Sequence, residues 1–153
     1  MNILPKKATI TGITGQDGGY LSEFLLGNLN ASRDWGYAGD YVKAMYLLLQ
    51  KEKPLDIVIG TGKTISIREF VEKCFSYIDI NIIWEGNGLD ERGICSKTNK
   101  SLVEISKQFF RPADVELLVA DPRRAKSELN WEPKVNIDGL VSMMMEYDLR
   151  KEL

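Results

Sequence analysis

The sequence predicts an α/β protein, because short runs of β-forming residues alternate with segments of helical periodicity. Residues 8–13, 56–60 and 81–84 are runs of strand length that are rich in Ile, Val or Thr. Residues 40–48 and 66–78 place apolar side chains at the three- and four-residue spacings of an amphipathic helix. The length of 153 residues suits one compact domain.

The first third of the chain is predicted to form a strand, a glycine turn and a helix. The β-rich run 8–13 leads into the turn, and apolar side chains over 18–26 predict the start of a helix. Residues 28–39 are polar and aromatic and contain two further glycines, so we expect a loop. Asp40 is a favourable N-cap residue, and a second helix is expected to begin near it.

The middle of the chain carries the clearest helix signal. Ser66 and Glu69 have the spacing of a capping box, in which each side chain binds the other residue's backbone N–H. An apolar stripe follows from Ile67 to Ile78, so we expect an amphipathic helix there. Residues 56–60 before it predict a buried strand, and residues 81–84 after it predict another.

The last third is predicted to hold a loop, a strand and two helices. Residues 86–99 are rich in glycine and charge, which indicates a loop, and 102–105 form a short apolar run typical of a strand. The helix expected over 121–129 opens with an N-cap aspartate and a proline at the first helical position, where a missing N–H costs nothing. A final helix is expected to begin after Asn136.

Composition excludes several classes of function. The formal net charge of −2 leaves no basic excess for a phosphate backbone, so no nucleic-acid partner is expected. No apolar run approaches the roughly 20 residues that span a bilayer, so no membrane partner is expected either. The chain has no histidine, which removes Ser-His-Asp and Cys-His systems and His-ligated metal sites. Cys74 and Cys95 form no metal or disulfide pattern, which indicates a reducing cytoplasm.

A Gly-x-x-Gly-x-x-Gly pattern, formed by Gly12, Gly15 and Gly18, lies between the first predicted strand and the first predicted helix. Glycines at such a turn let the backbone approach a pyrophosphate, whose charge then lies at a helix N-terminus. The alternative is a glycine-rich turn that binds no ligand. The position between a strand and a helix favours the dinucleotide interpretation.

The continuation that a dinucleotide site needs is missing from the sequence. A second parallel strand should follow the helix and end in a residue that contacts the ribose. Asp34 and Asp40 lie about 20 residues after the glycine turn, the usual distance. Residues 29–35 nevertheless lack the pattern of a buried strand, so we reject both aspartates as ribose ligands. The sequence therefore contains only the glycine-turn part of the expected nucleotide-binding site.

Four motifs follow one another along the chain: Thr9-Ile-Thr-Gly-Ile-Thr-Gly-Gln-Asp-Gly-Gly-Tyr-Leu21, Leu26-Gly-Asn-Leu-Asn-Ala-Ser-Arg-Asp-Trp-Gly-Tyr-Ala-Gly-Asp-Tyr-Val42, Phe109-Phe-Arg-Pro-Ala-Asp-Val115 and Asp121-Pro-Arg-Arg-Ala-Lys-Ser-Glu-Leu-Asn-Trp-Glu-Pro-Lys134. In this order they resemble the GDP-mannose 4,6-dehydratase family. That family belongs to the extended short-chain dehydrogenase/reductases, also called NAD-dependent epimerases/dehydratases. The resemblance covers nearly the whole chain.

The resemblance implies that the chain joins two parts. Residues 1–26 resemble the first strand, turn and helix of an NAD(P)-binding Rossmann fold. Residues 27–153 resemble the family's mixed α/β domain that binds the sugar nucleotide. The segment between these parts in the family holds most of the Rossmann sheet and the Ser/Thr, Glu and Tyr-x-x-x-Lys catalytic group. It has no counterpart here, so we assign no catalytic residue.

The resemblance also implies the ligands and the residues that bind them. NADP is the implied cofactor and GDP-mannose the implied substrate. An arginine beside the sugar diphosphate suits its charge, and family members often carry glutamate at the position of Asp114. The expected cofactor-binding residues are Gly12, Gly15, Gln16, Asp17 and Gly18, and the expected substrate-binding residues are Asn28, Arg33, Arg111 and Asp114.

Tyr147 and Lys151 repeat the Tyr-x-x-x-Lys spacing near the C-terminus. Any helix places residues four apart on one face, so we interpret this pair as a chance spacing on a solvated helix. Trp35 and Trp131 are expected to be core residues.

Three interpretations stay open: a dehydratase by descent with an internal deletion, a non-catalytic module that retains GDP-sugar binding, and a fragment without a biochemical role. We expect no dehydratase turnover from this chain alone. A second copy or a full-length relative could cover the exposed glycine turn.

Overall fold

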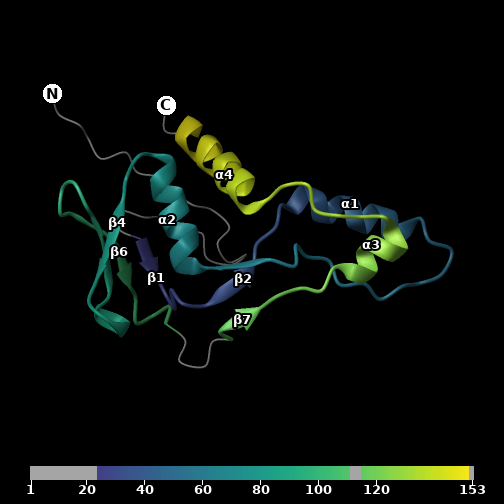
Figure 1. The fold of residues 1–153 in the computed structure, drawn as a ribbon, viewed down its shortest axis with the longest axis horizontal. Helices are drawn as coiled ribbons and strands as arrows, with labels where there is room; N and C mark the ends of the chain where they lie inside the picture. Colours follow the sequence, from purple (N-terminus) through teal and green to yellow (C-terminus); the bar gives the residue numbers. More distant parts are fainter. Residues whose placement is uncertain (1–23, 111–114, 152–153) are drawn as a thin grey trace.

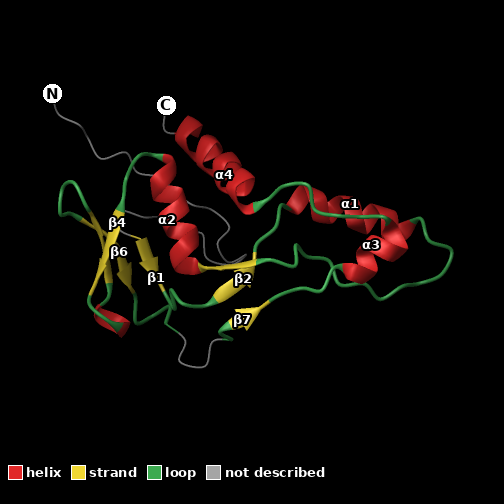
Figure 2. Ribbon diagram, in the orientation of Figure 1, coloured by secondary structure: helices red, strands yellow, loops and turns green. Residues whose placement is uncertain are grey.

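A computed structural model of the chain describes residues 24–110 and 115–151 (Figure 1). Within these residues the chain forms two small sheets and the helices that pack around them (Figure 2), which confirms the α/β class. In chain order the elements are β1 (Phe24–Leu26), β2 (Ser32–Asp34), α1 (Ala38–Leu49), β3 (Thr64–Ser66), α2 (Ile67–Tyr77), β4 (Ile82–Glu85), the 3-10 helix η1 (Gly88–Asp90), β5 (Arg92–Cys95), β6 (Ser101–Ile105), β7 (Leu117–Leu118), α3 (Arg123–Leu129) and α4 (Ile137–Lys151).

The larger sheet has the strand order β1-β6-β5-β4. Strands β4, β5 and β6 form an antiparallel meander, and β1 is added parallel to β6. Gly93 of β5 lies where a Cβ would be 3.0 Å from side-chain atoms of both Ile82 and Trp84. The absence of a side chain at Gly93 therefore lets the β4 side chains close over β5.

Helix α2 covers the larger sheet, and α4 packs beside α2 (Figure 1). The capping box predicted for α2 is confirmed, because Ser66 Oγ accepts the Glu69 N–H at 3.1 Å and a Glu69 carboxylate oxygen accepts the Ser66 N–H at 2.8 Å. At the start of α4, Asn136 Oδ1 accepts the Gly139 N–H at 2.8 Å. The main core lies between these elements and contains Phe70, Val71, Cys74, Phe75, Val103, Val141 and Met145.

The smaller sheet has the order β3-β2-β7 and joins segments that are far apart in the sequence. Its central strand β2 pairs antiparallel with β3, placing Arg33 opposite Ile65. On its other side β2 pairs parallel with β7, placing Arg33 opposite Leu118. In Figure 1 this sheet lies between the larger sheet and the pair of helices α1 and α3.

Helices α1 and α3 form a second hydrophobic cluster at the other end of the molecule (Figure 1). Asp40, buried in the first turn of α1, accepts the backbone N–H groups of Lys134 at 2.8 Å and Val135 at 3.0 Å. Its carbonyl oxygen accepts the indole N–H of Trp131 at 2.9 Å. Helix α1 thereby positions the segment that leads into α4. The cluster contains buried Ala44, Ala125, Leu129 and Trp131, with Tyr41, Leu47, Leu48, Ile57 and Ile59 packed against it.

Two segments that we predicted as loops contain strands, so those predictions were wrong. Residues 28–39 include β2, and residues 86–99 include η1 and β5. The helix expected over 18–26 was also wrong at its end, because residues 24–26 form β1. These short strands depend on partners from distant parts of the chain, and local patterns do not reveal such partners.

The remaining differences concern a strand and two helix caps. Residues 56–60, predicted as a buried strand, belong to neither sheet. Tyr37, not Asp40, is the N-cap residue of α1. The Asp40 carboxylate instead accepts hydrogen bonds from the backbone N–H groups of Lys134 and Val135. Pro122, not Asp121, is the N-cap of α3. The predictions of β6, of the end of α3 at Leu129 and of a last helix after Asn136 are confirmed.

Candidate substrate-binding site

Arg33 lies on β2, the central strand of the smaller sheet, with its side chain half buried. Its Nη1 donates to the carbonyl oxygens of Val115 at 2.6 Å and of Ser32 at 2.9 Å. Val115 directly follows the segment that carries Arg111 and Asp114. The guanidinium of Arg33 is therefore held by two backbone carbonyls.

Asn28 lies in the turn between β1 and β2, next to Leu26 and Gly27, which contact Ser106 and Phe109 after the end of β6. The N–H of Ser106 donates to the Leu26 carbonyl at 2.8 Å, which brings the end of β6 against the β1–β2 turn. A Cβ on Gly27 would lie 2.5 Å from the carbonyl oxygen of Phe109, so glycine is needed for this close approach. Asn28 is half buried, and its Oδ1 accepts the Asn30 N–H at 3.0 Å.

The structure describes two of the predicted substrate residues, Asn28 and Arg33, which lie five positions apart on the β1–β2 turn and on β2. Next to Arg33, the Ser32 N–H donates to the Glu116 carbonyl at 2.7 Å, which adds to the pairing of β2 with β7. The other predicted site residues lie outside the described residues, and their roles stay predictions. These are Gly12, Gly15, Gln16, Asp17, Gly18, Arg111 and Asp114.

Both carboxylate oxygens of Asp34, the residue after Arg33, accept hydrogen bonds from other parts of the chain. Its Oδ1 accepts the Thr61 N–H at 2.8 Å and the Thr61 hydroxyl at 2.6 Å. Its Oδ2 accepts the N–H groups of Gly62 at 2.8 Å and Ala120 at 3.1 Å. The carboxylate therefore fixes β2 against two other segments, which agrees with our rejection of Asp34 as a ribose ligand.

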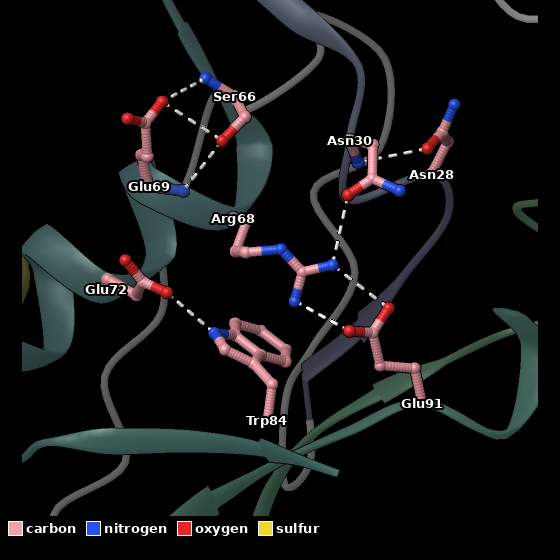
Figure 3. A network of polar contacts seen from close by, with 8 residues as sticks. All are labelled: Asn28, Asn30, Ser66, Arg68, Glu69, Glu72, Trp84 and Glu91. Atoms are coloured by element: carbon pink, nitrogen blue, oxygen red, sulfur yellow. Dashed lines mark hydrogen bonds and ion pairs between the residues drawn. The ribbon is translucent and has the colours of Figure 1, made fainter. Parts of the chain in front are cut away.

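A network around Arg68 orients the turn that carries Asn28 (Figure 3). The Arg68 guanidinium makes two bonds to Glu91, at 2.7 and 3.1 Å, and a third to Asn30 Oδ1 at 3.1 Å. It also lies 4.6 Å from the ring centroid of Trp84, whose indole N–H donates to Glu72 at 2.7 Å. These bonds tie the β1–β2 turn to α2, β4 and the start of β5.

Sequence reasoning missed Arg68, although one signal was present. Arg68 lies in the first turn of α2, where the helix dipole disfavours a positive charge. A cation at that position indicates a specific partner, and Glu91 is that partner, with side chains of Arg68 and Glu91 only 23% and 15% exposed. The two residues are 23 positions apart in the sequence, so no local pattern indicates that they pair.

Tyr147 lies on α4 and lines a mostly apolar pocket of about 400 Å³. The wall opposite α4 is formed by residues 35–38, including Tyr37, which directly follow Arg33 and Asp34. Trp35 stacks on Phe70 with ring centroids 4.3 Å apart, so it is part of the core as expected. Tyr147 therefore lies near the end of β2 in space, but the side chain of Lys151 lies outside the described residues.

Another pocket, of about 330 Å³, is lined by Asp90, Glu91, Arg92 and Glu104 with two apolar neighbours. Its three carboxylates against one guanidinium make it unsuitable for a sugar diphosphate. The described residues hold no group of three or more His, Cys, Asp or Glu side chains that could bind a metal ion. Among the same residues, no helix has the length and apolar character needed to cross a membrane.

The two thiols lie in different environments. Burial, with the nearby Asp148 carboxylate as a smaller cause, raises the pKa of Cys74 to about 12. Cys74 is therefore a neutral core residue and no nucleophile at physiological pH. At the β5–β6 hairpin, the Thr98 hydroxyl and the amides of Lys97 and Thr98 lower the pKa of Cys95 by hydrogen bonding to its sulfur.

A family model described as GDP-mannose 4,6 dehydratase matches residues 24–144, which include both sheets and most of α4. The chain belongs to the GDP-mannose 4,6-dehydratase family. It is 52% identical over 124 residues to the GDP-mannose 4,6 dehydratase of Dictyostelium discoideum, and 48% identical over 131 residues to that of Homo sapiens. These segments cover 81% and 86% of this chain but 35% of each relative, so the chain spans about a third of their length.

Two solved structures share the fold of the chain. The dTDP-glucose 4,6-dehydratase of Bacillus anthracis in complex with NAD has a TM-score of 0.63 at 18% identity, over 86% of this chain and 36% of that chain. RMD from Pseudomonas aeruginosa complexed with NADPH has a TM-score of 0.62 at 15% identity, over 86% and 37%. The division that we predict between residues 26 and 27 stays a prediction.

Proposed function

We propose that this chain is the substrate-binding third of a GDP-mannose 4,6-dehydratase and that it binds GDP-mannose. Two findings support the proposal: membership of the family, and the hydrogen bond from Arg33 to the carbonyl of Val115. Arg111 and Asp114 come just before Val115 in the sequence, so the bond from Arg33 to the Val115 carbonyl supports assigning these residues to one ligand.

Arg33 and Arg111 would bind the diphosphate of the sugar nucleotide. A guanidinium forms paired, charge-assisted bonds to phosphate oxygens, and its geometry is useful only when the group is oriented in advance. The Val115 and Ser32 carbonyls provide that orientation for Arg33. Asp114 and Asn28 would bind hydroxyl and amide groups of the nucleoside and sugar, since both carry acceptors suited to them.

The complete family reaction converts GDP-mannose to GDP-4-keto-6-deoxymannose, and we propose that this chain does not carry it out alone. The family's proton-transferring tyrosine and glutamate belong to the segment without a counterpart here. NADP would supply the hydride chemistry in a full-length member. The described residues do not fit a complete dinucleotide site, because Asp34 and Asp40 are both bonded to backbone amides and supply no ribose carboxylate.

Calorimetric titration of the purified chain with GDP-mannose tests this proposal. We expect saturable binding that Arg33→Gln weakens by roughly tenfold or more, since a bond between charged groups contributes about 1.5–3 kcal/mol. The matched control is Arg92→Gln, an exposed arginine at the acidic pocket, which should leave the affinity unchanged. Equal affinities for the two variants, or no binding by a folded chain, would contradict the proposal and favour a fragment without a role.

Product analysis tests the absence of turnover. After incubation with GDP-mannose and NADP we expect no 4-keto-6-deoxy sugar, because the proton-transfer groups are missing. Formation of that product, with loss in Tyr147→Phe, would show that Tyr147 acts where we assign no catalytic residue. We also propose a cytoplasmic location for the chain. Subcellular fractionation of the native source would check this location.

A further inference from the structure

The connection between β4 and β5 contains the only Asn-Gly pair of the sequence, Asn87-Gly88. Strand β4 ends at Glu85 and β5 begins at Arg92, so the pair lies in a short turn that includes η1. Asn87 and Gly88 are both exposed. A Cβ added to Gly88 would meet no heavy atom within 4 Å. Both residues are therefore open to solvent, and nothing packs against the glycine.

An Asn-Gly pair is chemically labile, because the glycine nitrogen can attack the side-chain amide of the asparagine. A bond forms between the Gly88 nitrogen and Asn87 Cγ, the Gly88 nitrogen loses its proton to solvent, and the side-chain nitrogen leaves as ammonia. Water then opens the resulting succinimide ring. Addition at Cγ breaks the new bond and gives aspartate. Addition at the backbone carbonyl carbon breaks the original peptide bond and gives isoaspartate, in which the main chain runs through Cγ.

The structure leaves both reacting groups without competing partners. Within residues 24–110 and 115–151, the Gly88 N–H donates no hydrogen bond, and the Asn87 side chain makes none. A nitrogen or an amide that was already bonded would have to give up that bond before the ring could close. Gly86 and Gly88 flank the asparagine with φ values of 81° and 60°, so no side chain restricts the backbone on either side.

Asn99 provides a comparison within the same sheet. It lies in the turn between β5 and β6, is exposed, and has a φ of 58°. Its N–H donates to the Cys95 carbonyl at 2.9 Å, and the next residue is Lys100, whose side chain hinders ring closure. Asn99 therefore shares the exposure of Asn87 but lacks the glycine that makes the reaction fast.

The product would act on the Arg68 network, because Glu91 belongs to the same turn. The Asn87 carbonyl oxygen accepts the Asp90 N–H at 3.2 Å, and the next residue, Glu91, binds Arg68 at 2.7 and 3.1 Å (Figure 3). Isoaspartate converts this carbonyl to a free carboxylate, so the bond to Asp90 is lost. It also adds a negative charge and lengthens the main chain just before Glu91.

We propose that Asn87 is a site of spontaneous deamidation and that the isoaspartate product weakens the ion pair between Arg68 and Glu91. Water is the only co-reactant, and ammonia is the leaving group. The proposal does not depend on GDP-mannose binding, so its tests and the ligand titration can fail independently.

The first test follows the folded chain by peptide mass mapping during incubation at neutral pH. We expect the Asn87 peptide to gain the mass difference between an amide and an acid, while Asn99 keeps its amide. A protein isoaspartate methyltransferase should then label the Asn87 peptide with a methyl group from S-adenosylmethionine. Asn87→Gln is the control and should give no label, because its larger ring closes far more slowly. Conversion in the urea-unfolded chain but not in the folded chain would overturn the proposal.

The second test measures what the product does to the fold. We expect the isoaspartate form, separated by ion exchange, to unfold at lower urea than the fresh chain. Asn87→Asp carries the charge on an unaltered main chain and should keep nearly the wild-type midpoint. In Glu91→Gln the shift caused by isoaspartate should shrink, because the ion pair is already weakened. An unchanged midpoint, or an equal shift in Glu91→Gln, would overturn the link to the Arg68 network.

Discussion

The carboxylate of Asp34 accepts the backbone N–H of Ala120 at 3.1 Å, across 86 residues of sequence. The same carboxylate binds Thr61 and Gly62 in the turn before β3. One side chain therefore joins the central strand of the smaller sheet to the segments on both of its sides. Because Arg33 is the preceding residue, this junction also determines where the predicted substrate-binding arginine lies.

Replacing this carboxylate should loosen the smaller sheet. Asp34→Asn retains the size of the side chain but turns an NH₂ group toward backbone donors. We expect the free energy of unfolding to fall by about 2–3 kcal/mol, measured by urea denaturation, because bonds to a charged acceptor are lost and donors remain unsatisfied. Asp56→Asn, an exposed aspartate, is the control and should change stability little. Equal urea midpoints for both variants would contradict this role.

The pair between Arg68 and Glu91 should contribute more to stability than an exposed pair. Glu91→Gln leaves a largely buried guanidinium with weaker partners, and we expect a loss of about 2 kcal/mol. Glu132→Gln breaks the exposed pair with Lys126, whose side chains are 66% and 63% exposed, and should cost less than about 0.5 kcal/mol. The measurement is urea denaturation at low and high salt. A similar loss in both variants would show that burial has no effect on these pairs.

The capping box of α2 provides a third prediction. Ser66→Ala removes the oxygen that accepts the Glu69 N–H, and we expect a loss of about 1 kcal/mol and a lower Tm. Ser76→Ala, near the exposed end of the same helix, should be nearly neutral. Differential scanning calorimetry of the two variants compares them directly. An unchanged Tm in Ser66→Ala would indicate that another group satisfies the first turn.

Cys74 should make the chain less stable at alkaline pH. Burial raises the pKa of its thiol from 9.0 to about 12 in the folded chain. Between these values the thiol ionises only when the chain unfolds, so the stabilisation present below pH 9 is lost as the pH rises. The expected slope from this group is about 1.4 kcal/mol of unfolding free energy per pH unit.

The comparison that isolates this contribution uses Cys74→Ala. The variant loses packing at neutral pH, but its stability should fall less steeply between pH 9 and 11 than that of the wild type. Burial also raises the pKa of Tyr41, which gives both proteins a shared background slope. Parallel curves for the two proteins would show that Cys74 does not titrate as described. Denaturant titrations at several pH values provide the curves.

Much of the fold was predictable where the determinants are local. The capping box from Ser66 to Glu69 and the apolar stripe after it contain all that α2 needs, and both occur within one short segment. The strand β2 is different, because Ser-Arg-Asp has no apolar alternation. Its stability comes from β3, β7 and the Asp34 bonds, which the chain brings together over long distances.

The site residues Arg33 and Asn28 stay predictions from the family resemblance. The structure adds the bonds that hold each of them, which the sequence did not indicate. The Val115 carbonyl and the network around Arg68 could not be inferred, because each joins residues that no local pattern relates. Gly93 explains a further error, since the glycine that suggested a loop is the residue that lets β4 close over β5.

The order of strands in the smaller sheet has a consequence for synthesis on the ribosome. Its middle strand is made early, its antiparallel neighbour follows some thirty residues later, and its parallel neighbour at Leu117–Leu118 comes last. Until that final strand has left the exit tunnel, the nascent chain displays an unfinished sheet edge. A chain that is truncated before Leu117 would therefore keep one edge of β2 unpaired, and an unpaired strand edge is a template for aggregation.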